Sequence, residues 1–132
     1  MLKKEKVFTI NSFLQATSII SVCQNKNIVP IIYIKYLIID RLGYDWFKEF
    51  KCLLEKQFSK KKFKLCIECK KNYGLFIKLV ELKADYLMVH ANNEALKRLN
   101  QIAKKNKVLL NPKFSVVDLS KIKNVELILN KI

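Results

Sequence analysis

The apolar positions along this chain change repeatedly between two patterns. In one, they recur every three or four residues, which is typical of an amphipathic helix. In the other, β-branched and aromatic residues form continuous runs, which is typical of a strand buried on both faces. The runs predict four strands, over residues 28–36, 62–69, 85–91 and 107–111. The spaced positions predict helices over residues 11–26, 44–58, 74–83, 92–106 and 120–131.

Strands that alternate with helical segments of this length are typical of β-α-β units, which build a parallel sheet with right-handed crossovers. We therefore expect one α/β domain over residues 1–132. The expected architecture is a three-layer α/β/α sandwich with a four-stranded, mainly parallel sheet of flavodoxin- or Rossmann-like type, and a half-barrel-like arrangement is the alternative. Residues 1–10 are expected to form an N-terminal tail, residues 37–45 a loop, and residues 120–132 to carry the C-terminal helix, with Asn11 and either Asn92 or Asn93 as helix caps.

The net charge changes this picture less than its size suggests. The chain carries a formal charge of +15, and 24 of its 26 basic residues are lysines. A strongly basic surface often indicates a nucleic-acid partner, but the planar fork of arginine fits phosphate better than lysine does. Residue types with AT-rich codons make up about half of the chain, which is typical of an AT-rich genome. We therefore interpret the lysines first as a solvated coat, and nucleic-acid binding is not favoured.

The same composition bears on compartment and partners. Hydrophobic residues make up 51% of the chain, which disfavours disorder. No stretch reaches the ~20 apolar residues of a membrane span, and polar residues such as Asn11, Gln15 and Thr17 interrupt the apolar segment that a secretory signal would need. We expect a cytoplasmic protein with reduced thiols, and a homodimer or another protein as its partner.

The stretch CIECKKNYGLF, residues 66–76, contains a CxxC pair. A structural zinc ion needs four ligands, and this chain has one CxxC and one histidine. In a strand over residues 62–69, the side chains of Cys66 and Cys69 point to opposite faces. A dithiol redox site instead has its CxxC at a helix start. We expect no metal and no cofactor, and we assign Cys66 to the core.

The end of this strand is the best candidate for a binding site. Ligands of open α/β sheets bind beyond the carboxyl ends of the strands, and a helix N-terminus favours an anion. The two glycines of the chain, Gly43 and Gly74, both precede predicted helices that follow strands. The candidate ligand-binding residues are Glu68, Cys69, Asn72, Gly74 and Asn111.

Four residues at strand ends are candidates for catalysis: Lys35, Glu68, Cys69 and His90. If they converge, they could perform acid–base or Schiff-base chemistry. The simpler interpretation is that strand ends are polar because they meet water. Our leading hypothesis is a non-enzymatic binding or interaction module. The alternatives are a small enzyme or anion-binding protein that uses Glu68, Cys69 and the helix start at Gly74, and a basic protein associated with nucleic acid or the ribosome.

The pattern CIEC, Gly74 and ADYLMV resembles a strand–turn–helix motif of a family of small, functionally unassigned alphaproteobacterial α/β proteins. Glu68, Cys69 and Gly74 take the places of Asp, Cys and Gly in an Asp-Cys-Gly…Pro-Gly motif, and LGYDWF and LNPKFSVVDL are similar to two further family segments. The chain departs from the motif at Lys35, Lys70 and Tyr73. The resemblance implies an α/β fold and carries no activity.

Overall fold

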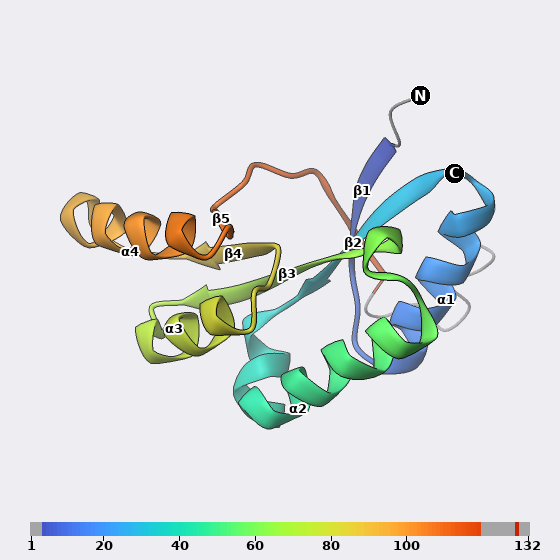
Figure 1. Cartoon of the computed structure of the whole chain (residues 1–132), viewed down its shortest axis with the longest axis horizontal. Helices are drawn as coiled ribbons and strands as arrows, with labels where there is room; N and C mark the ends of the chain where they lie inside the picture. The colour runs from blue at the N-terminus through green and yellow to red at the C-terminus, as the bar shows by residue number, and fades with distance from the viewer. Residues whose placement is uncertain (1–3, 120–128, 130–132) are drawn as a thin grey trace.

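The computed structural model describes residues 4–119 and residue 129. Within them, six strands form one sheet, in the order β5-β4-β3-β2-β1-β6, and every pair is parallel (Figure 1). The strands are β1 (Lys4–Thr9), β2 (Ile28–Ile34), β3 (Lys64–Lys70), β4 (Tyr86–Val89), β5 (Leu109–Leu110) and β6 (Val116–Asp118). The helices are α1 (Phe13–Asn25), α2 (Tyr36–Gln57), the short 3-10 helix η1 (Lys60–Lys62), α3 (Tyr73–Glu81) and α4 (Asn93–Lys105).

The α/β class and the parallel sheet are confirmed, but the prediction of four strands is wrong. The expected tail over residues 1–10 contains β1, which pairs with β2 along its whole length. Its first three residues are charged, so its apolar run is too short to indicate a strand. β6 has three residues and pairs with β1 at the edge of the sheet. β1 and β6 are therefore defined by their pairing with neighbouring strands more than by the local pattern of apolar residues.

The helices α1 to α4 pack on one face of the sheet. The order β1 to β5 advances one position at each crossover, and crossovers of one hand that advance in one direction place their helices on the same face. Side chains from all four helices accordingly join one core with every second residue of the strands. In the described part of the chain, the architecture therefore differs from a three-layer sandwich and is closer to the half-barrel-like alternative.

The opposite face of the sheet, which we call the helix-free face, has its own smaller core. Val7, Ile31, Cys66 and Tyr86 are buried there. The connection from β5 to β6 passes over this face from one edge of the sheet to the other (Figure 1). Phe114 from that connection packs edge-to-face on the Tyr86 ring, with the ring centroids 5.1 Å apart. The connection therefore supplies the cover that a second helix layer would otherwise provide.

Local sequence decides where α1, α3 and α4 begin, because a side chain at the N-cap of each accepts from its first turn. Ser12, not Asn11, caps α1, because its hydroxyl accepts from the backbone N–H of Gln15 at 3.2 Å. Asn92 caps α4 as predicted. Residues 37–45 are not a loop: α2 begins at Tyr36 and is broken at Gly43, whose φ of 88° and ψ of 173° are not helical.

Two further expectations concern the C-terminal helix and membrane spans. The helix predicted over residues 120–131 lies outside the described residues, apart from Leu129, which is buried in the main core. Among the helices that are described, none is both long and apolar enough to cross a membrane.

Candidate functional site

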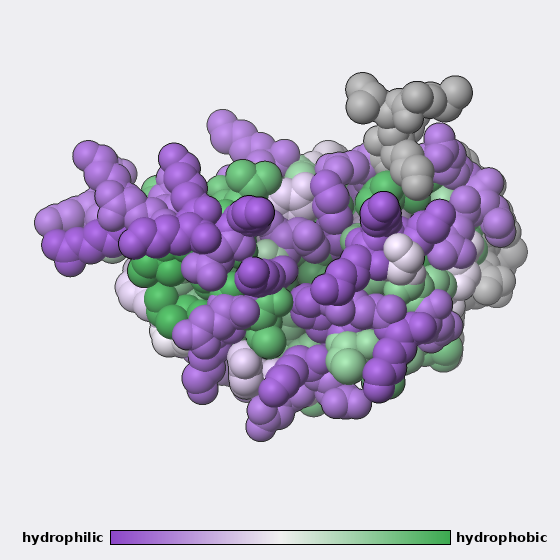
Figure 2. Space-filling model, in the orientation of Figure 1, coloured by the Kyte–Doolittle hydropathy of each residue, from purple (hydrophilic) through white to green (hydrophobic). Residues whose placement is uncertain are grey.

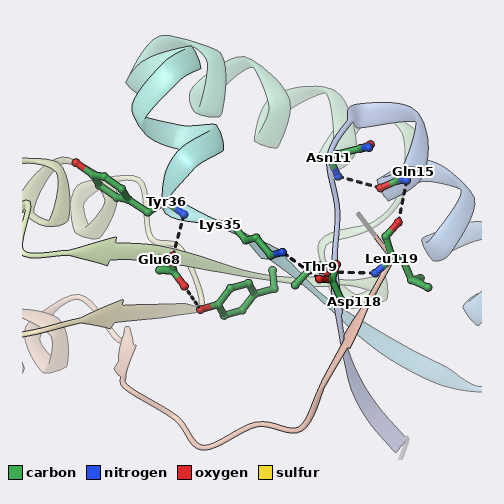
Figure 3. Close-up of polar contacts among 9 residues, drawn as sticks. Thr9, Asn11, Gln15, Lys35, Tyr36, Glu68, Asp118 and Leu119 are labelled. Atoms are coloured by element: carbon green, nitrogen blue, oxygen red, sulfur yellow. Dashed lines mark hydrogen bonds and ion pairs between the residues drawn. The ribbon is translucent and has the colours of Figure 1, made fainter. Parts of the chain in front are cut away.

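Because the strands are parallel, the carboxyl ends of all six described strands lie along one edge of the sheet. We call this the carboxyl edge. Two groups of polar contacts form there (Figure 3). One joins β1, β2 and β6, and the other joins β2, β3 and the start of α2. The predicted residues Lys35 and Glu68 belong to different groups.

Lys35 belongs to the first group, in which it pairs with Asp118. Its Nζ lies 3.0 Å from the Asp118 Oδ2, and the Thr9 hydroxyl donates to the Asp118 Oδ1. The backbone N–H of Leu119 donates to the Thr9 Oγ1 at 3.2 Å, and the Gln15 side chain donates to the Leu119 carbonyl at 3.0 Å. These contacts join β6 to β1 and β2, so Lys35 has a structural partner here.

Glu68 forms the second group, at the start of α2. Its carboxylate accepts from the Tyr33 hydroxyl at 2.8 Å and from the backbone N–H of Tyr36 at 3.2 Å. Lys35, the N-cap residue of α2, makes no side-chain capping bond, so Glu68 caps this helix from a neighbouring strand. Burial, and next the hydrogen bond to Glu68, raises the pKa of Tyr33. The Tyr33 hydroxyl therefore keeps its proton and remains a donor.

The catalytic candidates do not converge. Lys35 points to Asp118, whereas Glu68 points to Tyr33 and the start of α2 (Figure 3). Cys69 is fully buried in the helix-covered core, on the other face of the sheet from Cys66. The alternation that we expected for CIEC therefore separates the two sulfurs. In the described part of the chain, no three His, Cys, Asp or Glu side chains are grouped to hold a metal ion.

Burial also makes the CIEC thiols poor nucleophiles. It raises the pKa of Cys69 to about 12, with a smaller contribution from the negative charge of Glu68. Burial likewise raises the pKa of Cys66. Reactive thiolate is therefore scarce at neutral pH in both residues.

This difference in burial predicts the alkylation pattern of the folded protein. At pH 8, we expect iodoacetamide to modify the exposed Cys52 and to leave the buried Cys23, Cys66 and Cys69 unmodified. Mass spectrometry of tryptic peptides measures the modification at each site, and the same reaction in urea should label all four. Rapid labelling of Cys69 in the folded protein would contradict its buried position.

His90 and Asn111 also lie at the carboxyl edge, and both support backbone structure there. His90 is exposed, and its carbonyl accepts from the Tyr73 hydroxyl at 2.8 Å. The Asn111 side chain accepts from the Val89 N–H at 2.7 Å and donates to the Val89 carbonyl at 3.0 Å. It therefore extends the β4–β5 pairing with its amide group.

The two glycines meet at a hollow of about 330 Å³ between α2 and α3. Asn72 and Gly74 line it from the start of α3, and Gly43 and Tyr44 line it from the break in α2. The Asn72 Oδ1 accepts from the Leu75 N–H at 3.0 Å and thereby caps α3. Of the predicted ligand-binding residues, the hollow thus brings together Asn72 and Gly74, whereas Glu68, Cys69 and Asn111 do not line it.

The sequence prediction missed two kinds of residue at this edge. Thr9 and Asp118 were missed because β1 and β6 were not predicted. The aromatic residues Tyr36, Tyr44 and Tyr73 were missed although the sequence carries a signal: Tyr44 directly follows one glycine, and Tyr73 directly precedes the other.

Comparison with protein-family models and with curated proteins gives no match for this chain. The class of this protein is therefore described by its own structure. It is a basic α/β protein with an all-parallel sheet and a hollow at the carboxyl edge. The resemblance to the alphaproteobacterial family stays a prediction.

Proposed function

We propose that this protein is a non-enzymatic binding or interaction module whose partner contacts the carboxyl edge at the hollow between α2 and α3. The observation that carries the proposal is the meeting of both glycines at this hollow. The chain has two glycines in all, and at the carboxyl edge a backbone without a side chain leaves room for a ligand to approach. The all-parallel sheet is compatible with a Rossmann-like fold in the broad sense, and ligands of such sheets bind at this edge.

A catalytic role has less support than binding. An acid–base or Schiff-base site needs its groups within hydrogen-bonding reach of one substrate. Lys35 pairs with Asp118, Glu68 caps α2, and Cys69 is buried in the helix-covered core. We therefore propose that Lys35 and Glu68 stabilise the edge. The four free cysteines support a cytoplasmic location, where thiols stay reduced.

Site-specific photo-crosslinking tests this proposal. Benzoylphenylalanine is introduced in place of Lys78, an exposed residue that lines the hollow. The matched control carries it in place of Lys61, an exposed lysine of η1 that precedes β3 at the opposite edge of the sheet. We expect an adduct of defined mass in native cells from position 78 that is absent from position 61 and is suppressed by excess unlabelled protein.

Two results would count against a binding edge. The first is the absence of any adduct from position 78. The second is the same set of adducts from both positions, which would indicate contact through the basic surface in general and not through the hollow.

A further inference from the structure

Three tyrosines lie at or beside the hollow. Tyr44 lines it together with Lys78. The Tyr36 hydroxyl contacts the lining residues Asp40 and Asn72, and Tyr73 directly precedes the lining residue Gly74. Tyr36 begins α2, Tyr44 follows the break in α2, and Tyr73 begins α3. The Lys70 Nζ lies 5.5 Å from the centroid of the Tyr36 ring, and the Lys78 Nζ lies 5.5 Å from that of Tyr44. We propose that this edge binds single-stranded nucleic acid, an inference that rests on the proposed binding function and names the class of its partner.

Hydrogen bonds hold two of these rings in place before any partner binds. The Tyr73 hydroxyl donates to the His90 carbonyl at 2.8 Å. The Tyr36 hydroxyl donates to the Asp40 Oδ1 at 3.3 Å. Tyr73 is 37% exposed. Fixed and partly exposed rings are platforms on which unpaired bases stack without strong sequence preference, and pre-organisation reduces the entropy that binding costs.

The lysines beside these rings are available for phosphate. Lys70, Lys71 and Lys78 are exposed. Within the described chain, the ion pairs involve other basic residues, such as Lys35 with Asp118. Glu68, the carboxylate nearest in sequence to Lys70 and Lys71, is already bound to Tyr33 and the start of α2. The local charge therefore complements a polyanion.

One acidic residue opposes this charge. Asp40 is the one carboxylate among the residues that line the hollow. Its oxygen already accepts from the Tyr36 hydroxyl, and Lys78 lines the same hollow. We therefore place the phosphates along Lys70, Lys71 and Lys78, and the bases over the tyrosine rings.

The net charge of the chain alone would not support this inference. Hydrophilic residues cover most of the visible face in a broad coat, with apolar patches between them (Figure 2). At the carboxyl edge, lysines lie over the partly exposed rings of Tyr36 and Tyr44. Elsewhere, Lys64 lies over Tyr86, but that ring is buried and cannot stack on a base. An acidic peptide would use the lysines and leave the rings without a role. A duplex keeps its bases stacked inside, so its bases cannot reach these rings.

The residue types at this edge indicate binding that does not depend on the base sequence of the nucleic acid. Base-specific reading commonly uses arginine or an amide group in bidentate contact. The chain has two arginines, Arg41 and Arg98, and the side chain of Asn72 is engaged in capping α3. We therefore expect a similar affinity for single strands of different sequence.

Fluorescence anisotropy with a short labelled oligouridine, and with a duplex of equal length as the comparison, tests the inference. We expect the purified protein to bind the single strand more tightly than the duplex. Tyr73→Leu should weaken binding of the single strand about tenfold. Tyr73→Phe keeps the ring for stacking but loses the hydrogen bond that fixes it, so its affinity should lie between that of the wild type and that of Tyr73→Leu.

A matched pair of charge variants separates the edge from the general lysine coat. Lys71→Gln/Lys78→Gln should reduce the slope of log K against log salt by about 1.4, because each lost phosphate contact removes about 0.7. Lys61→Gln/Lys62→Gln removes the same charge from η1 and should leave the slope unchanged. Circular dichroism melting of each variant checks that it is folded.

The outcomes distinguish this inference from the proposed function. Failure to bind oligouridine, or an equal effect of both lysine pairs, would overturn the inference. If position 78 then still forms a nuclease-resistant adduct with a protein, the binding function stands with a different partner. If position 78 forms no adduct and oligouridine does not bind, both proposals fail.

Discussion

Replacing Ile31 with alanine (Ile31→Ala) is expected to lower the free energy of unfolding by about 2–5 kcal/mol. Ile31 lies on the helix-free face and is 0% exposed. It belongs to the small core with Val7, Cys66 and Tyr86, against which Phe114 packs. Truncation removes buried apolar surface and leaves a cavity that the strands cannot fill by moving. Urea denaturation of the purified protein measures the change.

The control for this variant is Leu109→Ala, on the edge strand β5. Leu109 is 63% exposed, so its truncation should change stability by less than about 0.5 kcal/mol. A loss below about 1 kcal/mol for Ile31→Ala would contradict the fold described above. It would mean that the β5–β6 connection does not cover this face of the sheet.

Replacing Gly43 with alanine (Gly43→Ala) is expected to lower the free energy of unfolding by about 1–3 kcal/mol. The φ of 88° and ψ of 173° at Gly43 belong to a region that is essentially restricted to glycine. The cost is conformational and not steric, since an added Cβ would meet no heavy atom within 4 Å. Thermal and urea denaturation should both show the loss.

Gly74→Ala is the matched control, because Gly74 lines the same hollow. An added Cβ at Gly74 would lie 3.7 Å from the Asn72 Oδ1, which is an ordinary contact. Its backbone conformation suits other residues, so alanine should be neutral or stabilise the fold by up to about 1 kcal/mol through the unfolded state. Equal destabilisation by both substitutions would contradict this difference between the two glycines.

The two glycines differ in the structure, although their contexts in the sequence are alike. In the sequence they have the same context, before a helix and after a strand. In the structure, Gly43 breaks α2, whereas Gly74 lies within the first turn of α3 and needs no special conformation. We therefore expect the shape of the hollow to depend on Gly43, and Gly74 to contribute open space.

Some of the predicted elements follow from local chemistry and were correct. The run IVPIIYI is β2, because β-branched residues buried on both faces give a continuous apolar signal. The amphipathic spacing around Phe47, Phe50 and Leu54 is the second half of α2. The separation of Cys66 from Cys69 also needed no tertiary information, because the side chains of a strand alternate between its faces.

Other elements could not be read locally. The segment LIIDR is too short before Gly43 to show a helical repeat of apolar residues, although α2 begins before it and Glu68 on β3 caps its first turn. β6 has three residues and is defined by pairing with β1. The prediction of helices on both faces of the sheet was wrong. The local pattern of apolar residues does not specify the direction in which successive crossovers advance, and this direction decides which face each helix covers.

The periodicity of the chain was thus sufficient for its α/β class and for its parallel strands. The tertiary structure decided which side chains meet at the carboxyl edge. Thr9 and Asp118 are 109 residues apart and in hydrogen-bonding contact, whereas Lys35 and Glu68 lie near the ends of neighbouring strands and have separate partners. Such contacts depend on strand order and on the path of the β5–β6 connection. The periodicity of apolar residues shows only which face of an element is buried. It contains no information on strand order or on the path of this connection.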